Sequence, residues 1–159
     1  MIDSHTEKSV QYIHTVDFPA LLKKLDISLF VTTYQAQRVL VFSAGPEKLN
    51  MLMRIFPRPT GFALNNKQMA LCSKHQLLIF KRVYEVKNIE GQKEDFDFCF
   101  APRIAHFCGD VQGHELAWIK DLPHFINTRF NCISIPSEKF SFEVVWKPKF
   151  LTEIVPKDR

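Results

Sequence analysis

Short apolar runs separated by polar turns follow one another along most of this chain. Turn residues such as Gly45-Pro46, Arg58-Pro-Thr-Gly61 and Pro136-Ser137 lie between the runs. Many short strands punctuated in this way are typical of an all-β sandwich, barrel or propeller. We expect strands at Ile27–Tyr34, Arg38–Ser43, Met51–Ile55, Phe62–Leu64, Gln68–Ser73, Gln76–Val83, Glu115–Ile119, His124–Thr128, Cys132–Ile135 and Phe142–Trp146.

The N-terminal segment has a different pattern. Residues 1–17 are mostly polar and are expected to form a flexible arm. After them Asp17 is suited to cap a short helix, since Asp is a preferred N-cap residue. Pro19 fits the same helix, because proline is tolerated in a first helical turn. Leu21, Leu22 and Leu25 would give this helix one apolar face.

Three segments of the chain resemble one another. Each has an apolar strand, a polar corner and a second apolar strand, beginning at Phe30, Ala70 and Phe125. The intervals between these starts are 40 and 55 residues, and residues 84–109 are expected to form an insertion that accounts for the longer one. Such periods predict β-propeller-like repeats of four-stranded antiparallel blades.

Residues 18–159 would then hold about two and a half to three blades, whereas a closed propeller needs at least four. We therefore expect a partial propeller, most simply a truncated one. Remaining blades or another copy of the chain would cover the open edge. An open stack of sheets is the other alternative.

Composition and charge argue against two classes of binding partner, nucleic acids and membranes. The net charge is +4, but basic residues occur as separate pairs such as Lys23-Lys24 and Lys81-Arg82, so no nucleic-acid partner is expected. No signal peptide and no apolar run of membrane-spanning length is present, so no membrane partner is expected either. The four cysteines form no C-x-x-C pair, which favours reduced thiols and a cytoplasmic location.

Several uncommon motifs resemble an uncharacterised bacterial family of conserved hypothetical proteins, of the TIGR03032 or DUF4915 type. The motifs are Pro102-Arg-Ile-Ala-His-Phe-Cys-Gly-Asp110, Val111-Gln-Gly-His-Glu-Leu-Ala117, Asn127-Thr-Arg-Phe-Asn-Cys132 and Trp146-Lys-Pro148. The resemblance runs from about residue 18 to the end of the chain. It implies a propeller-like fold and no particular activity.

The most concentrated candidate chemistry lies between residues 106 and 115. His106, Asp110, His114 and Glu115 combine imidazole and carboxylate groups, which can bind a divalent metal or provide a base and its orienting partner. The metal candidates are His106, Asp110 and His114. Because Gly109 and Gly113 favour a loop over a helix, the alternative is a loop held by hydrogen bonds between blades.

A second candidate follows the third repeat's first strand. Arg129 could bind a carboxylate or phosphate, with Asn127 orienting the ligand. Alternatively Asn127 closes a tight corner while Arg129 stacks between blades. The matching corners at Thr32-Thr33 and Lys74-His75 are also polar, as a shared channel rim would require.

Two classes of function fit these features. The first is a binding or scaffolding module that recognises a small molecule, glycan or protein at the channel rim. The second is a metal-assisted hydrolase or lactonase-like propeller enzyme. An inactive truncated fragment is a third reading. Since no catalytic group is secure, the sequence favours binding over catalysis, and the catalytic residues stay unknown.

Overall fold

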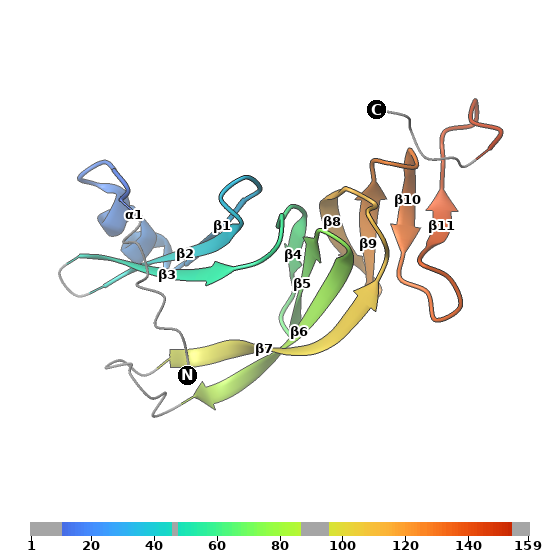
Figure 1. Ribbon diagram of the computed structural model, residues 1–159. Helices are drawn as coiled ribbons and strands as arrows, with labels where there is room; N and C mark the ends of the chain where they lie inside the picture. The colour runs from blue at the N-terminus through green and yellow to red at the C-terminus, as the bar shows by residue number, and fades with distance from the viewer. Residues whose placement is uncertain (1–10, 46–47, 87–95, 154–159) are drawn as a thin grey trace, which may run out of the picture. The chain divides into compact units, whose positions relative to one another are not determined.

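A computed structural model describes residues 11–45, 48–86 and 96–153 of the chain (Figure 1). The elements are one helix, α1 (Phe18–Leu25), and the strands β1 (Leu29–Thr33), β2 (Arg38–Ala44), β3 (Leu49–Ile55), β4 (Phe62–Leu64), β5 (Gln68–Ser73), β6 (Gln76–Val86), β7 (Phe96–Phe107), β8 (Gly113–Ile119), β9 (Leu122–Asn127), β10 (Cys132–Ile135) and β11 (Glu143–Trp146). The protein is therefore all-β with one short helix, as the sequence predicts.

The strands form three sheets, in each of which neighbours in sequence are neighbours in space. The first has the order β1-β2-β3, the second β4-β5-β6-β7 and the third β8-β9-β10-β11. Pairing within the second and third sheets is antiparallel throughout. The chain divides into two compact units, Met1–Phe30 with Val41–Leu52 and Val31–Leu40 with Met53–Arg159.

The ten expected strands are all present, and those at Phe62–Leu64, Gln68–Ser73 and Cys132–Ile135 have the expected bounds. The expected insertion at residues 84–109 is wrong in part. Strand β7 lies inside it and completes the second sheet by pairing with β6. Pro102 obscures β7 in the sequence, because proline cannot donate to a sheet. It is accommodated on an edge strand, where a register shift separates the Ile79 and Phe80 pairings.

The helix α1 begins where it is expected, but it differs in detail. Asp17 occupies the N-cap position without making a side-chain capping bond, while Pro19 lies in the first turn. Leu22 is buried, whereas Leu21 and Leu25 are about half exposed. Within the same compact unit, the ring of Phe18 lies edge-on to Phe42 of β2.

The second and third sheets pack together around one core. The core side chains come from β5, β6, the β7–β8 connection and β9, and they are Ala70, Cys72, Leu77, Ile79, Cys108, Val111 and Phe125. Three partly buried side chains pack against this cluster: Leu116, Trp118 and Phe142. The backbones come close at Gly61 and Gly113, where the Gly61 N–H donates to the Gly113 carbonyl at 3.2 Å. A Cβ atom on Gly61 would lie 2.5 Å from the His114 carbonyl oxygen, so glycine is required there.

The strand register shows which positions of these two sheets are equivalent. The segment Gly61-Phe-Ala-Leu64 aligns with Glu115-Leu-Ala-Trp118, which makes Phe62 and Leu116 equivalent. Phe62 pairs with Leu71 and Leu116 pairs with Phe125, so Leu71 and Phe125 are counterparts. The sequence alignment of Ala70 with Phe125 is therefore wrong by one residue. Apolar residues occupy both faces of these two strands, so their pattern leaves the phase open. A shift of one residue exchanges the two faces of a strand.

Candidate functional site

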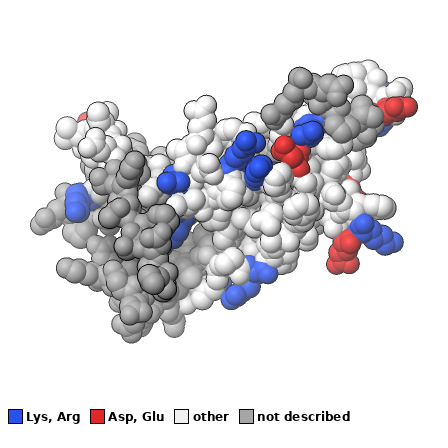
Figure 2. Space-filling view, viewed as in Figure 1, with Lys and Arg blue, Asp and Glu red and all other residues white. Residues whose placement is uncertain are grey.

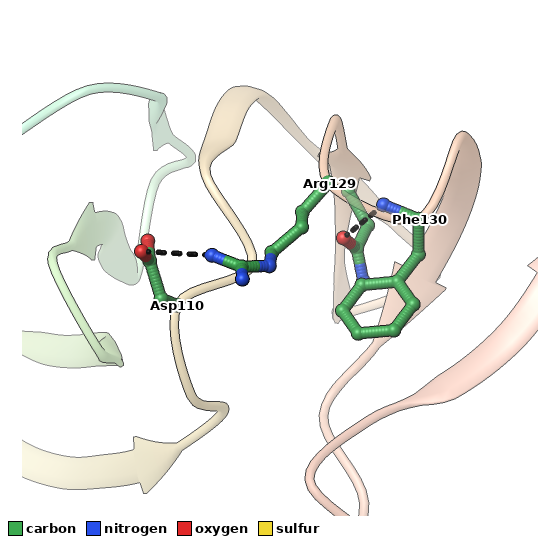
Figure 3. Close-up of polar contacts among 4 residues, drawn as sticks. Asp110, Arg129 and Phe130 are labelled. Atoms are coloured by element: carbon green, nitrogen blue, oxygen red, sulfur yellow. Dashed lines mark hydrogen bonds and ion pairs between the residues drawn. The ribbon is translucent and has the colours of Figure 1, made fainter. Parts of the chain in front are cut away.

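The corner after β9 is held by an ion pair (Figure 3). A guanidinium nitrogen of Arg129 lies 3.2 Å from a carboxylate oxygen of Asp110, in the connection between β7 and β8. The backbone N–H of Arg129 donates to the Val111 carbonyl at 3.2 Å, so the two connections are joined twice. About a third of each charged side chain is exposed, and the pair can therefore still be approached from solvent.

Asn127 has a structural position beside this pair. It is fully buried, and its amide oxygen accepts a hydrogen bond from the Phe130 N–H at 3.3 Å (Figure 3). Its amide nitrogen lies 3.4 Å from the Ser134 hydroxyl. These contacts close the corner between β9 and β10. They fit the hypothesis that Asn127 stabilises the turn better than the hypothesis that it orients a ligand.

The remaining residues predicted from the sequence do not join this corner. His106 lies in β7, while His114 and Glu115 lie in β8 with exposed side chains. The loop expected over residues 106–115 is thus limited to residues 108–112, because strand pairing extends from both sides. Across the described residues, His, Cys, Asp and Glu side chains form no group of three or more that could hold a metal ion.

A cleft of about 470 Å³ opens between the second and third sheets. One wall comes from the second sheet and includes His106, the other from the third sheet and includes Trp118. The complete lining is Lys67, Gln68, Ile79, Lys81, Ile104, His106, Trp118, Asp121, Leu122, Pro123, Pro136, Ser137 and Glu138. Of the six residues predicted from the sequence, His106 alone lines it.

Charges of both signs line this cleft. On the second sheet, the Lys81 ammonium donates to the side-chain oxygen of the buried Gln68 at 2.6 Å. Asp121 and Glu138 lie on the third sheet's wall. On that same wall the Trp118 indole N–H donates to the Ala63 carbonyl at 3.2 Å, which fixes the ring.

These cleft residues are not predictable from the sequence, because they come from strands and turns far apart in the chain. Lys67 and Glu138, for example, lie 71 positions apart. The one local signal is Gln68, a polar residue at the start of an apolar strand. A buried amide needs a partner, and its partner Lys81 lies in the cleft.

The thiols near the core are not suited to nucleophilic chemistry. Burial, with a smaller contribution from the Cys108 thiol, raises the pKa of Cys72 to about 12. Burial also raises the pKa of Cys108. Because the thiolate is the reactive form, the raised pKa values make both groups less reactive than an ordinary thiol at neutral pH.

Basic side chains are spread over the molecular surface. On the face drawn in Figure 2, Lys and Arg occur as separate spots and do not form a continuous stripe. Within the part of the chain that the structure describes, no helix is long and apolar enough to cross a membrane.

The fold and the cleft define an all-β protein of antiparallel sheets, with a cleft lined by both charged and apolar side chains between the second and the third sheet. A family model described as a domain of unknown function (DUF4915) matches residues 16–159, and the chain belongs to this family. Neither the curated proteins nor the solved structures contain a match to this chain.

Proposed function

We propose that this chain is a binding module whose sheets are arranged as propeller-like blades, and that the cleft between the second and third sheets binds a small saccharide. The observation that carries the proposal is the cleft itself. It has about 470 Å³ of space, charged groups of both signs and one fixed indole.

The stacking of the two four-stranded sheets supports the blade arrangement. Equivalent strands occupy equivalent places in both sheets, since β4 and β8 each begin a sheet and β7 and β11 each end one. The sheets share one core and approach face to face at Gly61 and Gly113. Successive propeller blades pack in this way because a single four-stranded sheet cannot bury both of its faces.

The mixture of groups in the cleft favours a polyhydroxylated ligand. Lys67 and Lys81 offer donors on one wall, and the carboxylates of Asp121 and Glu138 offer acceptors on the other. Hydroxyl groups can donate and accept, so a sugar can satisfy both walls, whereas an ion of either sign would meet like charge on one of them. Trp118 supplies an apolar ring surface, and the volume falls within the range of roughly 300–1,000 Å³ typical of ligand sites.

Calorimetric titration of the full chain against a set of neutral mono- and disaccharides tests this proposal. We expect at least one sugar to bind, and His106→Ala or Glu138→Gln to weaken its binding by about tenfold. The first variant removes a hydrogen-bonding group, and the second replaces a charged acceptor by a weaker neutral one. Inorganic phosphate and glycine are the comparison ligands and are not expected to bind.

The chain offers matched controls for both variants. His114→Ala and Glu115→Gln change the same residue types on the exposed surface of β8 and are expected to leave the affinity within about twofold. The proposal is wrong if no sugar binds, if phosphate binds instead, or if His114→Ala is as damaging as His106→Ala.

The metal-assisted hydrolase is the weaker candidate. The described residues offer no cluster of metal-ligating side chains to support it.

A further inference from the structure

The two walls of the cleft carry opposite charges. Lys67 and Lys81 line the wall formed by the second sheet, and Asp121 and Glu138 line the wall formed by the third. We propose, on the basis of the saccharide site proposed above, that the preferred ligand is a uronic acid whose carboxylate lies against Lys67 and Lys81. In a uronic acid a carboxylate replaces the terminal hydroxymethyl group of the sugar.

The Lys81 ammonium is held at the cleft wall by a buried amide. Gln68 of β5 and Lys81 of β6 are paired across the two strands, so both side chains leave the sheet on the same side. The next pair on that side, Ala70 and Ile79, belongs to the core shared with the third sheet. Gln68 is 5% exposed, and its side-chain oxygen accepts from the Lys81 ammonium at 2.6 Å. Because an ammonium group has three donors, others are left for a ligand.

Lys67 is carried by a turn whose backbone is fixed from two directions. The side-chain oxygen of Asn65 accepts from the N–H groups of Lys67 and Gln68, each at 2.9 Å. From β6, the Arg82 N–H donates to the Lys67 carbonyl at 2.8 Å. The Arg82 guanidinium carbon itself lies 3.8 Å from the centre of the Phe98 ring. The backbone that places the second lysine at the cleft is therefore ordered before any ligand binds.

The carboxylates on the opposite wall are not held in this way. Asp121 lies in the turn between β8 and β9, Glu138 follows β10, and both side chains are exposed. Among the described residues, neither carboxylate has a hydrogen bond or an ion pair. Binding costs less where the groups that contact the ligand are already ordered. The wall with the lysines is thus the better place for the charged group of a ligand.

A uronic acid satisfies both walls because its charge lies on one edge of the sugar ring. The carboxylate can accept from both lysines in charge-assisted hydrogen bonds, while hydroxyl groups on the opposite edge donate to Asp121 and Glu138. A simple anion such as phosphate has no uncharged edge to turn toward the carboxylates. An amino sugar would place its charge against the wall whose groups are not ordered.

Calorimetric titration of the full chain with matched sugars tests the proposal. The pairs are glucuronate and glucose, galacturonate and galactose, and mannuronate and mannose, with acetate as the comparison anion. In at least one pair we expect the uronate to bind about tenfold more tightly than the neutral sugar at low ionic strength, because two ammonium groups face its carboxylate. This ratio should fall in about 1 M sodium chloride, where charges more than about 3 Å apart are screened.

Two variants connect the preference to the ordered lysine. Lys81→Met removes an ammonium group, and Gln68→Glu places a competing carboxylate beside it. Each should lower the ratio of uronate to neutral-sugar affinity by about threefold to fivefold. Lys149→Met is the matched control, since it removes the same charge from an exposed position that does not line the cleft, and it should leave the ratio unchanged.

Thermal melting establishes that each variant is folded, and the exposed Lys81 provides a test even if Gln68→Glu does not fold. Equal or tighter binding of the neutral sugar in every pair overturns the preference and leaves the saccharide site standing. Acetate that binds as tightly as the uronate overturns it as well, because the sugar ring would then contribute nothing. A ratio that persists in folded Lys81→Met overturns the assignment to this wall. If no member of any pair binds, both proposals are wrong.

Discussion

At the scale of single residues, the clearest case is Cys72, a thiol enclosed where two sheets meet. Its pKa is raised to about 12, whereas the same thiol in the unfolded chain has an ordinary value near 9. The unfolded chain therefore loses this proton at a lower pH than the folded one. The contribution of Cys72 to stability is complete below pH 9 and is lost as the pH rises toward 12.

This linkage gives a prediction for stability at alkaline pH. Between pH 9 and 11 the free energy of unfolding of the wild type should fall relative to that of Cys72→Ala, by at most about 1.4 kcal/mol per pH unit. Urea unfolding of both proteins at pH 8, 9, 10 and 11 measures the difference. A difference that does not change with pH would show that the thiol is not desolvated.

The residues proposed from sequence illustrate what single side chains reveal. Asp110 and Arg129 do meet, and both were recognisable as polar residues beside turns. Their pairing was not predictable, because it depends on how the β7–β8 connection lies beside the corner after β9. Asn127 was recognisable as a corner residue because its short amide readily bonds to nearby backbone.

At the scale of elements, the sheets depend on a few backbone positions that admit no side chain. A Cβ on Gly61 would meet the backbone of His114, whereas a Cβ on Gly113 would lie 2.7 Å from the Cys72 sulfur. The His114 backbone cannot move away without disturbing strand β8, whereas the Cys72 sulfur can be removed by substituting that cysteine. The two glycines should therefore respond differently to the same substitution.

We expect Gly61→Ala to lower the free energy of unfolding by about 1–3 kcal/mol, as overpacking does in a close-packed interior. Gly113→Ala should also destabilise the protein, but adding Cys72→Ala should recover part of that loss. Cys72→Ala should recover nothing in the Gly61→Ala background. Chemical denaturation of the single and double variants measures these effects, and equal recovery in both backgrounds would contradict the packing at Gly61.

Most elements were predictable because short alternating apolar runs between turns specify strands locally. Strand β7 was not, since Pro102 and the neighbouring Arg103 interrupt its pattern. Its pairing partner is β6, and only that pairing shows that an edge position tolerates the proline.

At the scale of the whole molecule, the second and third sheets share one hydrophobic core. Phe125 of β9 is 1% exposed and belongs to the core cluster that also contains Leu77 and Ile79 of β6. Its removal should therefore affect strands of both sheets.

Phe125→Ala should cost about 3–5 kcal/mol, the usual loss for a buried phenylalanine. Amide hydrogen exchange should accelerate in β5 and β6 as well as in β8–β10, because the sheets open together. Phe107→Ala, at a position 70% exposed, is the control and should change stability by no more than about 0.5 kcal/mol. Faster exchange confined to β8–β10 would show that the sheets unfold independently.

The sequence by itself determined the all-β class, nearly all of the strands and the family, because alternation, turn residues and uncommon motifs are local properties of the chain. The tertiary structure alone decided which residues pair between neighbouring strands, how the second sheet packs on the third, and where the cleft between them lies. Those features depend on which side of each strand faces a neighbour, and a shift of one residue reverses that choice. The all-β pattern thus predicts the strands reliably, while the surfaces available for binding follow from how the sheets stack.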